Sequence, residues 1–204
     1  MRVYVESNFV LEIAFEQEQH AACEEIVRLA ETERSISLAI PSFCLAEPSF
    51  TLKRREDAQK ALARQLEGEL REFRRTPSFG RDAEWATVTR DLLLSAQDAS
   101  RRFESVSHRL IAAARVLPMT AEVVGDGWTL RNALALSSPD ALVLASILAD
   151  PELGHGPSCF LNKNRKDFDE PTIVGMLREK DCRLMTSFAD GLSRVRHALR
   201  AVPE

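Results

Sequence analysis

The chain is poor in the residues that mark several large protein classes. Its 204 residues include only four cysteines, with no CxxC pair and no neighbouring histidine cluster, so zinc ribbons and redox motifs are excluded. Eight glycines and nine prolines are too few for a collagenous or low-complexity chain. One tyrosine and two tryptophans provide no visible stacking platform for single-stranded nucleic acid. No apolar run approaches the roughly 20 residues of a membrane span.

Several catalytic motifs are also missing. The chain has no GxxxxGK[ST] loop and no GxSxG element, which argues against a P-loop nucleotidase and a serine hydrolase. A formal net charge of −4 provides no whole-molecule field that attracts nucleic acid. Glu6 stands where a signal peptide would need its apolar centre. We therefore expect a soluble, cytoplasmic protein with no membrane association.

What is present is 45% hydrophobic and 28% charged residues, and short strand-like segments that alternate with helical ones. The strand-like segments are residues 2–5, 37–40, 158–161 and 183–185. Such alternation predicts an α/β fold with a central parallel sheet of four to five strands between two helical layers. We expect one domain over residues 1–204. Ser7 and Ser138 are the expected caps of two of its helices.

The middle of the chain has a different pattern. Leu62, Leu66, Leu70 and Phe73 recur every three or four residues, and a second series follows after a Pro- and Gly-containing break. This pattern predicts an antiparallel helical hairpin over about residues 56–116. The second series consists of Trp85, Val88, Leu92, Ala96, Ala99, Phe103, Val106 and Leu110.

Four acidic residues lie in surroundings that otherwise favour apolar side chains. They are Glu6, Glu47, Asp140 and Asp167. Each has an ordinary explanation: Asp140 at the positive end of a helix, Glu6 and Glu47 paired with arginines, and Asp167 in a loop. They also follow strands or begin helices, so they can converge at the carboxyl edge of the sheet. Carboxylates that lie so close together repel one another, and a divalent cation such as Mg²⁺ or Mn²⁺ removes this repulsion.

The segments around these acids resemble the PIN-domain family of metal-dependent ribonucleases, which includes toxins of VapC-type toxin–antitoxin pairs. Val3 to Leu11 is similar to the family's opening strand and turn, and Pro41 to Glu47 to its second acidic motif. Pro139 to Ala145 and Asn162 to Phe168 are similar to its third and fourth motifs. The resemblance covers residues 1–52 and about 118–190, and the hairpin between them is longer than in the compact toxins.

The resemblance implies a three-layer α/β/α PIN-like domain that hydrolyses RNA phosphodiester bonds with one or two Mg²⁺ or Mn²⁺ ions and leaves a 5′ phosphate. It implies Glu6, Glu47, Asp140 and Asp167 as catalytic metal ligands. Asn8 and Asn164 would orient a carboxylate or a ligand water. A homodimer and an antitoxin that lays a helix or tail over the acidic pocket are the implied protein partners.

The first acid is Glu6 where the family pattern has Asp, and one methylene displaces a carboxylate by about 1.5 Å. This difference keeps a second interpretation open: a PIN-like RNA-binding or assembly module with an impaired metal site. A nuclease that acts on DNA is a third.

An RNA would need local cations on a chain of negative net charge. Lys163, Arg165 and Lys166 lie inside the fourth motif and are the predicted phosphate contacts. Basic residues of the hairpin, such as Arg75, Arg101 and Arg109, are either a second contact surface or a solvated face paired with nearby glutamates.

Overall fold

A parallel β-sheet of five strands forms the centre of the part of the chain that the computed structural model describes, which is residues 1–73, 75, 84–164 and 168–201. Its strand order is β3-β2-β1-β4-β5, so the first strand of the chain lies in the middle. The strands are β1 (Arg2–Val5), β2 (Ser37–Pro41), β3 (Ala114–Leu117), β4 (Ser158–Leu161) and β5 (Cys182–Met185). The predicted α/β class with a parallel sheet of four to five strands is confirmed.

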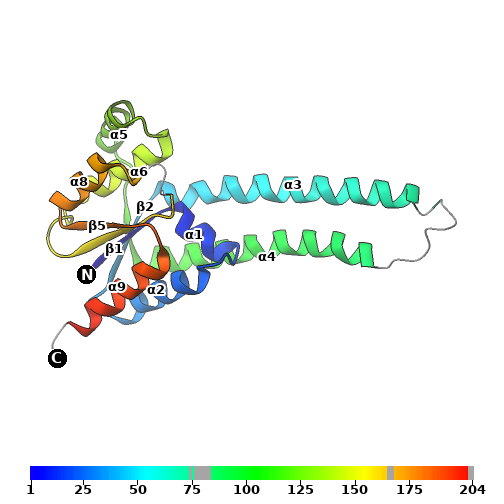
Figure 1. The fold of residues 1–204 in the computed structure, drawn as a ribbon, viewed down its shortest axis with the longest axis horizontal. Helices are drawn as coiled ribbons and strands as arrows, with labels where there is room; N and C mark the ends of the chain where they lie inside the picture. Colours follow the sequence, from blue (N-terminus) through cyan, green and yellow to red (C-terminus); the bar gives the residue numbers. More distant parts are fainter. Residues whose placement is uncertain (74, 76–83, 165–167, 202–204) are drawn as a thin grey trace.

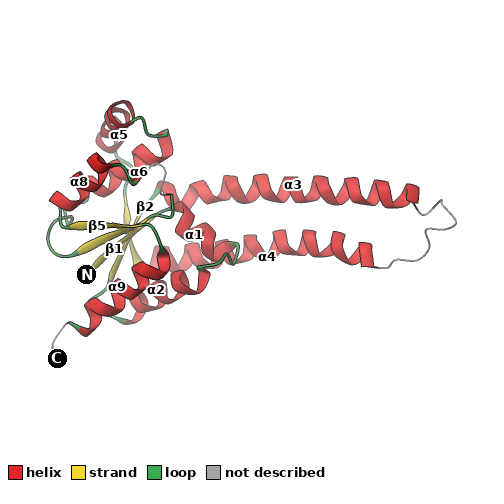
Figure 2. Ribbon diagram, in the orientation of Figure 1, coloured by secondary structure: helices red, strands yellow, loops and turns green. Residues whose placement is uncertain are grey.

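Helices cover both faces of this sheet. They are α1 (Ser7–Ala14), α2 (His20–Thr32), α3 (Phe43–Phe73), α4 (Glu84–Ala113), α5 (Ala121–Leu134), α6 (Ser138–Leu148), α8 (Pro171–Glu179) and α9 (Phe188–Arg200). Figure 1 shows α5, α6 and α8 on one side of the strands and α1, α2 and α9 on the other. Colouring by secondary structure makes the helix–sheet–helix layering plain (Figure 2). Among the described residues, no helix has both the length and the apolar character to cross a membrane.

Strand β3 begins at Ala114, whereas the sequence pattern predicts that the hairpin helix continues to about residue 116. Ala39 pairs with Arg115, and Pro41 pairs with Leu117. The apolar stripe of α4 runs without interruption up to this point, so periodicity alone does not reveal the change. Pairing with β2 decides it, because residues 114–117 can complete the edge of the sheet only in an extended conformation.

The predicted helical hairpin is formed by α3 and α4, but it extends far from the sheet instead of lying against the rest of the chain (Figure 1). Helix α3 begins at Phe43, well before residue 56, and it contains Pro48 close to its start, where one backbone hydrogen bond is lost. Ala63 of α3 and Ala96 of α4 are buried, whereas Leu62 and Val88 of the predicted stripes are 46% and 45% exposed. Beyond its base the described residues of α3 and α4 pack mainly on each other, so a narrow seam between the two helices is buried.

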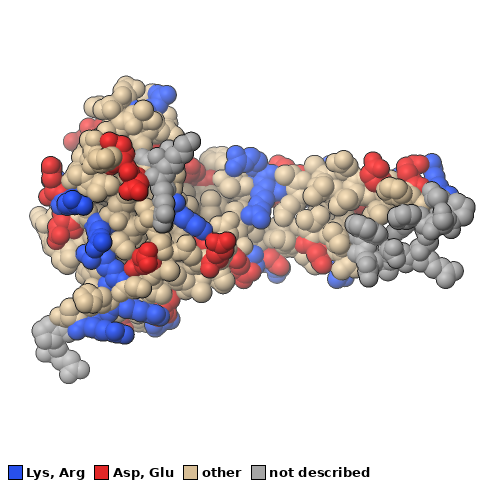
Figure 3. Space-filling model, viewed as in Figure 1, with Lys and Arg blue, Asp and Glu red and all other residues tan. Residues whose placement is uncertain are grey.

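Charged side chains of both signs are interspersed over the visible surface of the hairpin (Figure 3). Several of the predicted hairpin cations are in ion pairs: Arg75 with Glu72 at 3.0 Å, and Arg101 with Asp98. Arg109 bridges α4 to α2 through Glu24 and Glu31 at 2.6 and 2.9 Å; its partners are carboxylates of this chain. These pairs favour the interpretation of the hairpin arginines as a solvated, internally paired face.

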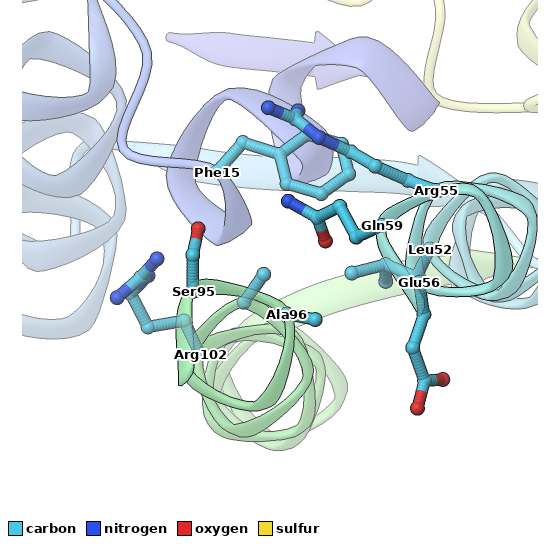
Figure 4. Close-up of a pocket in the computed structure, with 9 residues that line it drawn as sticks. Phe15, Leu52, Arg55, Glu56, Gln59, Ser95, Ala96 and Arg102 are labelled. Atoms are coloured by element: carbon cyan, nitrogen blue, oxygen red, sulfur yellow. The ribbon is translucent and has the colours of Figure 1, made fainter. Parts of the chain in front are cut away.

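The base of the hairpin is tied to the end of α1, as Figure 4 shows around Phe15. The guanidinium group of Arg55 lies over the Phe15 ring, 4.2 Å from its centroid. Arg102 Nε donates to the carbonyl oxygen of Ala14 at 2.9 Å, and Arg102 also pairs with Glu16 at 3.3 Å. A cavity of about 20 Å³ remains between these side chains, which is room for a water molecule and no more.

Two glycines provide a matched test of how α8 and α9 pack. A Cβ at Gly191 of α9 would lie 2.6 and 3.1 Å from the two methyl carbons of Leu161, which is fully buried in β4. A Cβ at Gly175 of α8 would meet no atom within 4 Å. We expect Gly191→Ala to lower the free energy of unfolding by about 1–3 kcal/mol through overpacking. Gly175→Ala should raise it by up to about 1 kcal/mol through helix propensity.

Urea unfolding curves of the two variants and the wild type measure both changes. Equal free energies of unfolding for the two variants would contradict the close packing of α9 on β4.

Candidate functional site at the carboxyl edge of the sheet

Glu6 is the most unusual acid at this edge. It directly follows β1 and precedes α1, and it is only 7% exposed. Its Oε1 atom is buried and accepts no hydrogen bond within the described part of the chain. Burial, followed by the negative charges of Asp140 and Glu47, raises the pKa of Glu6 to about 8. The backbone N–H groups of Asn8 and Ser7 oppose this shift and do not cancel it.

Glu47 comes to the same edge from the beginning of α3. The preceding strand β2 lies beside β1, so the two strand ends are neighbours. The Ser7 hydroxyl donates a hydrogen bond to Glu47 Oε2. The prediction that Ser7 caps α1 is therefore wrong: the cap position is Glu6, and the Ser7 side chain orients Glu47 instead.

Asp140 lies in the first turn of α6, whose cap is Ser137 rather than the predicted Ser138. The Ser137 hydroxyl accepts from the Asp140 backbone N–H at 3.3 Å and also donates to Asp140 Oδ2. Asp140 thus has the helix-start role that its sequence position suggests. Its effect on the pKa of Glu6 places its charge near that carboxyl group as well.

A pair of asparagines adds further oxygens at this edge. Asn8 Nδ2 donates to Asn162 Oδ1 at 3.2 Å, and the backbone N–H of Asn164 donates to the same oxygen at 2.6 Å. Asn162 directly follows β4 and is completely buried. Asn8 Oδ1 is buried without a hydrogen-bond partner among the described residues.

The sequence motifs point to Asn8 and Asn164, whereas the structure adds Asn162, whose side-chain oxygen accepts from both of them. The sequence does contain a signal for Asn162, because a polar residue that directly follows an apolar strand of a parallel sheet lies at the edge where ligands bind.

Of the three predicted phosphate contacts, Lys163 is the one that the structure describes. Lys163 Nζ pairs with Glu12 Oε2 at 3.1 Å, and Glu12 is only 1% exposed. Glu12 also accepts from the backbone N–H of Gln19 at 2.6 Å, so it ties the segment after β4 to α1 and to the start of α2. The charge of Lys163 is thus largely compensated within the chain, which weakens its case as a phosphate contact. Arg165, Lys166 and the fourth predicted acid, Asp167, lie outside the described residues.

The donor chemistry of this edge fits a hard divalent cation. Carboxylate and amide oxygens are the ligands that Mg²⁺ and Mn²⁺ prefer, and the buried oxygens Glu6 Oε1 and Asn8 Oδ1 have no hydrogen-bond donor in the described chain. Within residues 1–73, 75, 84–164 and 168–201, however, no three His, Cys, Asp or Glu side chains form a ready metal-binding group. The described acids are close enough to raise the pKa of Glu6, but they do not form a closed coordination shell.

No family model matches this chain, and none of the curated proteins matches it. The resemblance to PIN domains thus depends on the four sequence motifs.

The raised pKa of Glu6 predicts a pH-dependent loss of stability. The unfolded carboxyl group ionises near pH 4.5, whereas the folded one stays protonated up to about pH 8. The free energy of unfolding should therefore fall as pH rises through this window, by up to about 1.4 kcal/mol per pH unit, and level off above it. Glu6→Gln removes this contribution, so the variant should gain stability relative to wild type as pH rises.

Urea unfolding between about pH 5 and pH 8, with EDTA present, measures the difference. Glu18→Gln, at an exposed position, is the matched control and should follow wild type. A constant difference between wild type and Glu6→Gln over the whole range would refute the raised pKa.

Proposed function

We propose that this protein is a Mg²⁺- or Mn²⁺-dependent endoribonuclease of the PIN type. The observation that supports it best is the convergence of Glu6, Glu47 and Asp140, which come from three separate segments, on one edge of a parallel sheet. Together with burial, their mutual repulsion is strong enough to hold one carboxyl group protonated near neutral pH. Folded proteins keep such unfavourable charge clusters mainly at functional sites.

In this proposal Glu6, Glu47, Asp140 and Asp167 hold the metal. When bound, a divalent cation supplies an activated water and stabilises charge on the phosphate that is cleaved. The hydroxyl of Ser7 orients Glu47, and the hydroxyl of Ser137 orients Asp140. Asn8, held by Asn162, and Asn164 keep the segment after β4 against the start of α1, where an amide oxygen can orient a carboxylate or a water.

The biological setting belongs to the same proposal. A toxin of a toxin–antitoxin pair, acting in the cytoplasm as a homodimer, is the setting implied by the PIN resemblance. An antitoxin would cover the edge formed by Glu6, Glu47 and Asp140. Arg165 and Lys166, rather than Lys163, are the better proposed contacts to the RNA phosphates, because Glu12 already compensates Lys163.

The decisive experiment separates catalysis from helix capping. Asp140→Asn keeps the shape of the side chain and removes the charge of a proposed metal ligand. Asp190→Asn is the matched control, because Asp190 lies in the first turn of α9 and its N–H donates to the cap Ser187 at 3.3 Å, as that of Asp140 does to Ser137. We expect Asp140→Asn to reduce metal-dependent cleavage of a labelled single-stranded RNA by roughly 100-fold or more.

Asp190→Asn should cleave like wild type and lose only a small amount of stability, because its charge interacts favourably with the positive end of α9. Equal cleavage by the two variants would identify Asp140 as a capping residue and contradict the proposed ligand. A labelled single-stranded DNA of the same sequence, cleaved as fast as the RNA, would favour the DNA nuclease instead.

A second candidate function has specific support. A buried Glu6 that is protonated near neutral pH is a poor metal ligand, and the described acids form no ready metal-binding group. Both observations favour a PIN-like RNA-binding or assembly module with an impaired site.

Glu6→Asp tests between these two functions, because it withdraws the carboxylate by about 1.5 Å and restores the family's residue. If the site is functional as it stands, Glu6→Asp should change Mn²⁺ affinity and cleavage by no more than a few-fold. The impaired-site module instead predicts no cleavage by wild type and a gain of about tenfold or more in Mn²⁺ affinity for the variant. Calorimetric titration with Mn²⁺ and the RNA cleavage assay measure the two quantities.

A further inference from the structure

A second polar site lies beside β5, which is an edge strand of the sheet. A cavity of about 480 Å³ opens there between α8, the edge strand β5 and α9. It is lined by Val174, Arg178, Asp181, Cys182, Arg183, Leu184 and Arg194. Along β5 the lining runs from Asp181, which precedes the strand, to Leu184, and it does not include Glu6, Glu47 or Asp140 of the carboxyl edge. The cavity is therefore separate from the proposed nuclease site, and a ligand bound in it would not depend on nuclease activity.

The charge in this cavity is not balanced by the protein. Arg178, Arg183 and Arg194 contribute three positive charges and Asp181 one negative charge, which leaves an excess of two. Within the described part of the chain, none of the three arginines forms an ion pair with a carboxylate. Elsewhere on the surface, arginines such as Arg109 and Arg196 do have acidic partners, Glu31 and Glu25 among them. Figure 3 shows basic side chains running from α8 across the sheet edge to α9.

Arg194 provides a second, independent observation. Its Nε atom is buried and finds no acceptor among the described residues. A buried donor without an acceptor is unfavourable, and the same side chain lines the cavity, where an anion would interact with its guanidinium charge. Arg178 reaches the cavity from the last turn of α8, and Arg183 reaches it from the edge strand.

We propose that the cavity between α8, β5 and α9 binds a phosphate group, held by Arg178, Arg183 and Arg194. A phosphate monoester carries about −1.5 to −2 charges at pH 7, which matches the excess of two positive charges. Guanidinium groups bind phosphate oxygens in a bidentate geometry. The volume is within the range of about 300–1,000 Å³ that is typical of small-ligand sites, and it admits a nucleotide.

Two other occupants of this edge fit less well. A second copy of the chain that paired β5 with β5 in antiparallel fashion would bring Arg183 close to its equivalent, and like charges facing each other across strands are destabilising. An acidic peptide added to the edge would use only the four residues of β5 and would leave the hollow beside it unfilled.

Calorimetric titration of the full chain with inorganic pyrophosphate, in EDTA and at low salt, tests the site. Arg183→Gln changes an exposed residue, and Arg194→Gln removes the buried donor. Arg196→Gln is the matched control, because Arg196 lies on the same helix and is paired with Glu25 at 3.3 Å. We expect saturable binding by wild type, about tenfold weaker binding by each of the first two variants, and a change within about twofold for the control.

The absence of saturable binding, or equal weakening in all three variants, would overturn the proposal. Tighter binding of a glutamate-rich peptide than of pyrophosphate, with the same dependence on Arg183, would overturn it in favour of a peptide-binding edge. The source of the phosphate is distinguished by 5′-AMP and by an RNA hexamer with and without a 5′ phosphate. A preference for 5′-AMP indicates a free nucleotide, and a preference for the phosphorylated hexamer over its 5′-hydroxyl form indicates an RNA end; each supports the phosphate site.

Discussion

The pairing of β1 between β2 and β4 is the constraint on which the rest of the structure depends. Val3 is in register with Leu38 on one side and with Cys159 on the other, and all three side chains are buried. Because the three strands run in parallel, their carboxyl ends meet at one edge. That edge receives Glu6 directly from β1 and Asn162 directly from β4. The polar residues of the candidate site are thus brought together by the burial of apolar residues several positions earlier in the chain.

The acidic residues at this edge repel one another, and the favourable burial of the core has to offset this unfavourable energy. Burial and the charges of Asp140 and Glu47 act in the same direction on Glu6 and raise its pKa to about 8, so this carboxyl group is largely protonated at pH 7, where a carboxyl group in water is ionised. Hydroxyl groups bind the neighbouring acids: the Ser7 hydroxyl donates to Glu47, and the Ser137 hydroxyl donates to Asp140. A hydroxyl partner orients a carboxylate without neutralising its charge. The nearest described cation of the fourth motif, Lys163, is instead directed to Glu12.

The helical hairpin and the cavity at β5 show two different uses of arginine. Around the hairpin, Arg102 and Arg109 connect α4 to the ends of α1 and α2, and their charges are compensated by acidic partners. These contacts are structural, because they hold a two-helix projection against the body of the protein. At β5 the arginines converge from three elements around a hollow, without acidic partners in the described chain. Charge that the fold does not compensate is a reason to expect a ligand there.

The fold class could be predicted from the sequence alone, and so could Glu6, Glu47 and Asp140 as candidate site residues. Alternating short strands and helices predicted the parallel sheet, and an acid following Val3-Tyr4-Val5 marked Glu6, because local hydrophobic patterns record which side chains are buried. Tertiary structure alone decided the identity of β3, the Ser7–Glu47 and Glu12–Lys163 contacts, and the cavity of Arg178, Arg183 and Arg194. Each of these joins residues distant in the chain or placed on different elements. Their proximity depends on how helices and strands pack, which no local periodicity encodes.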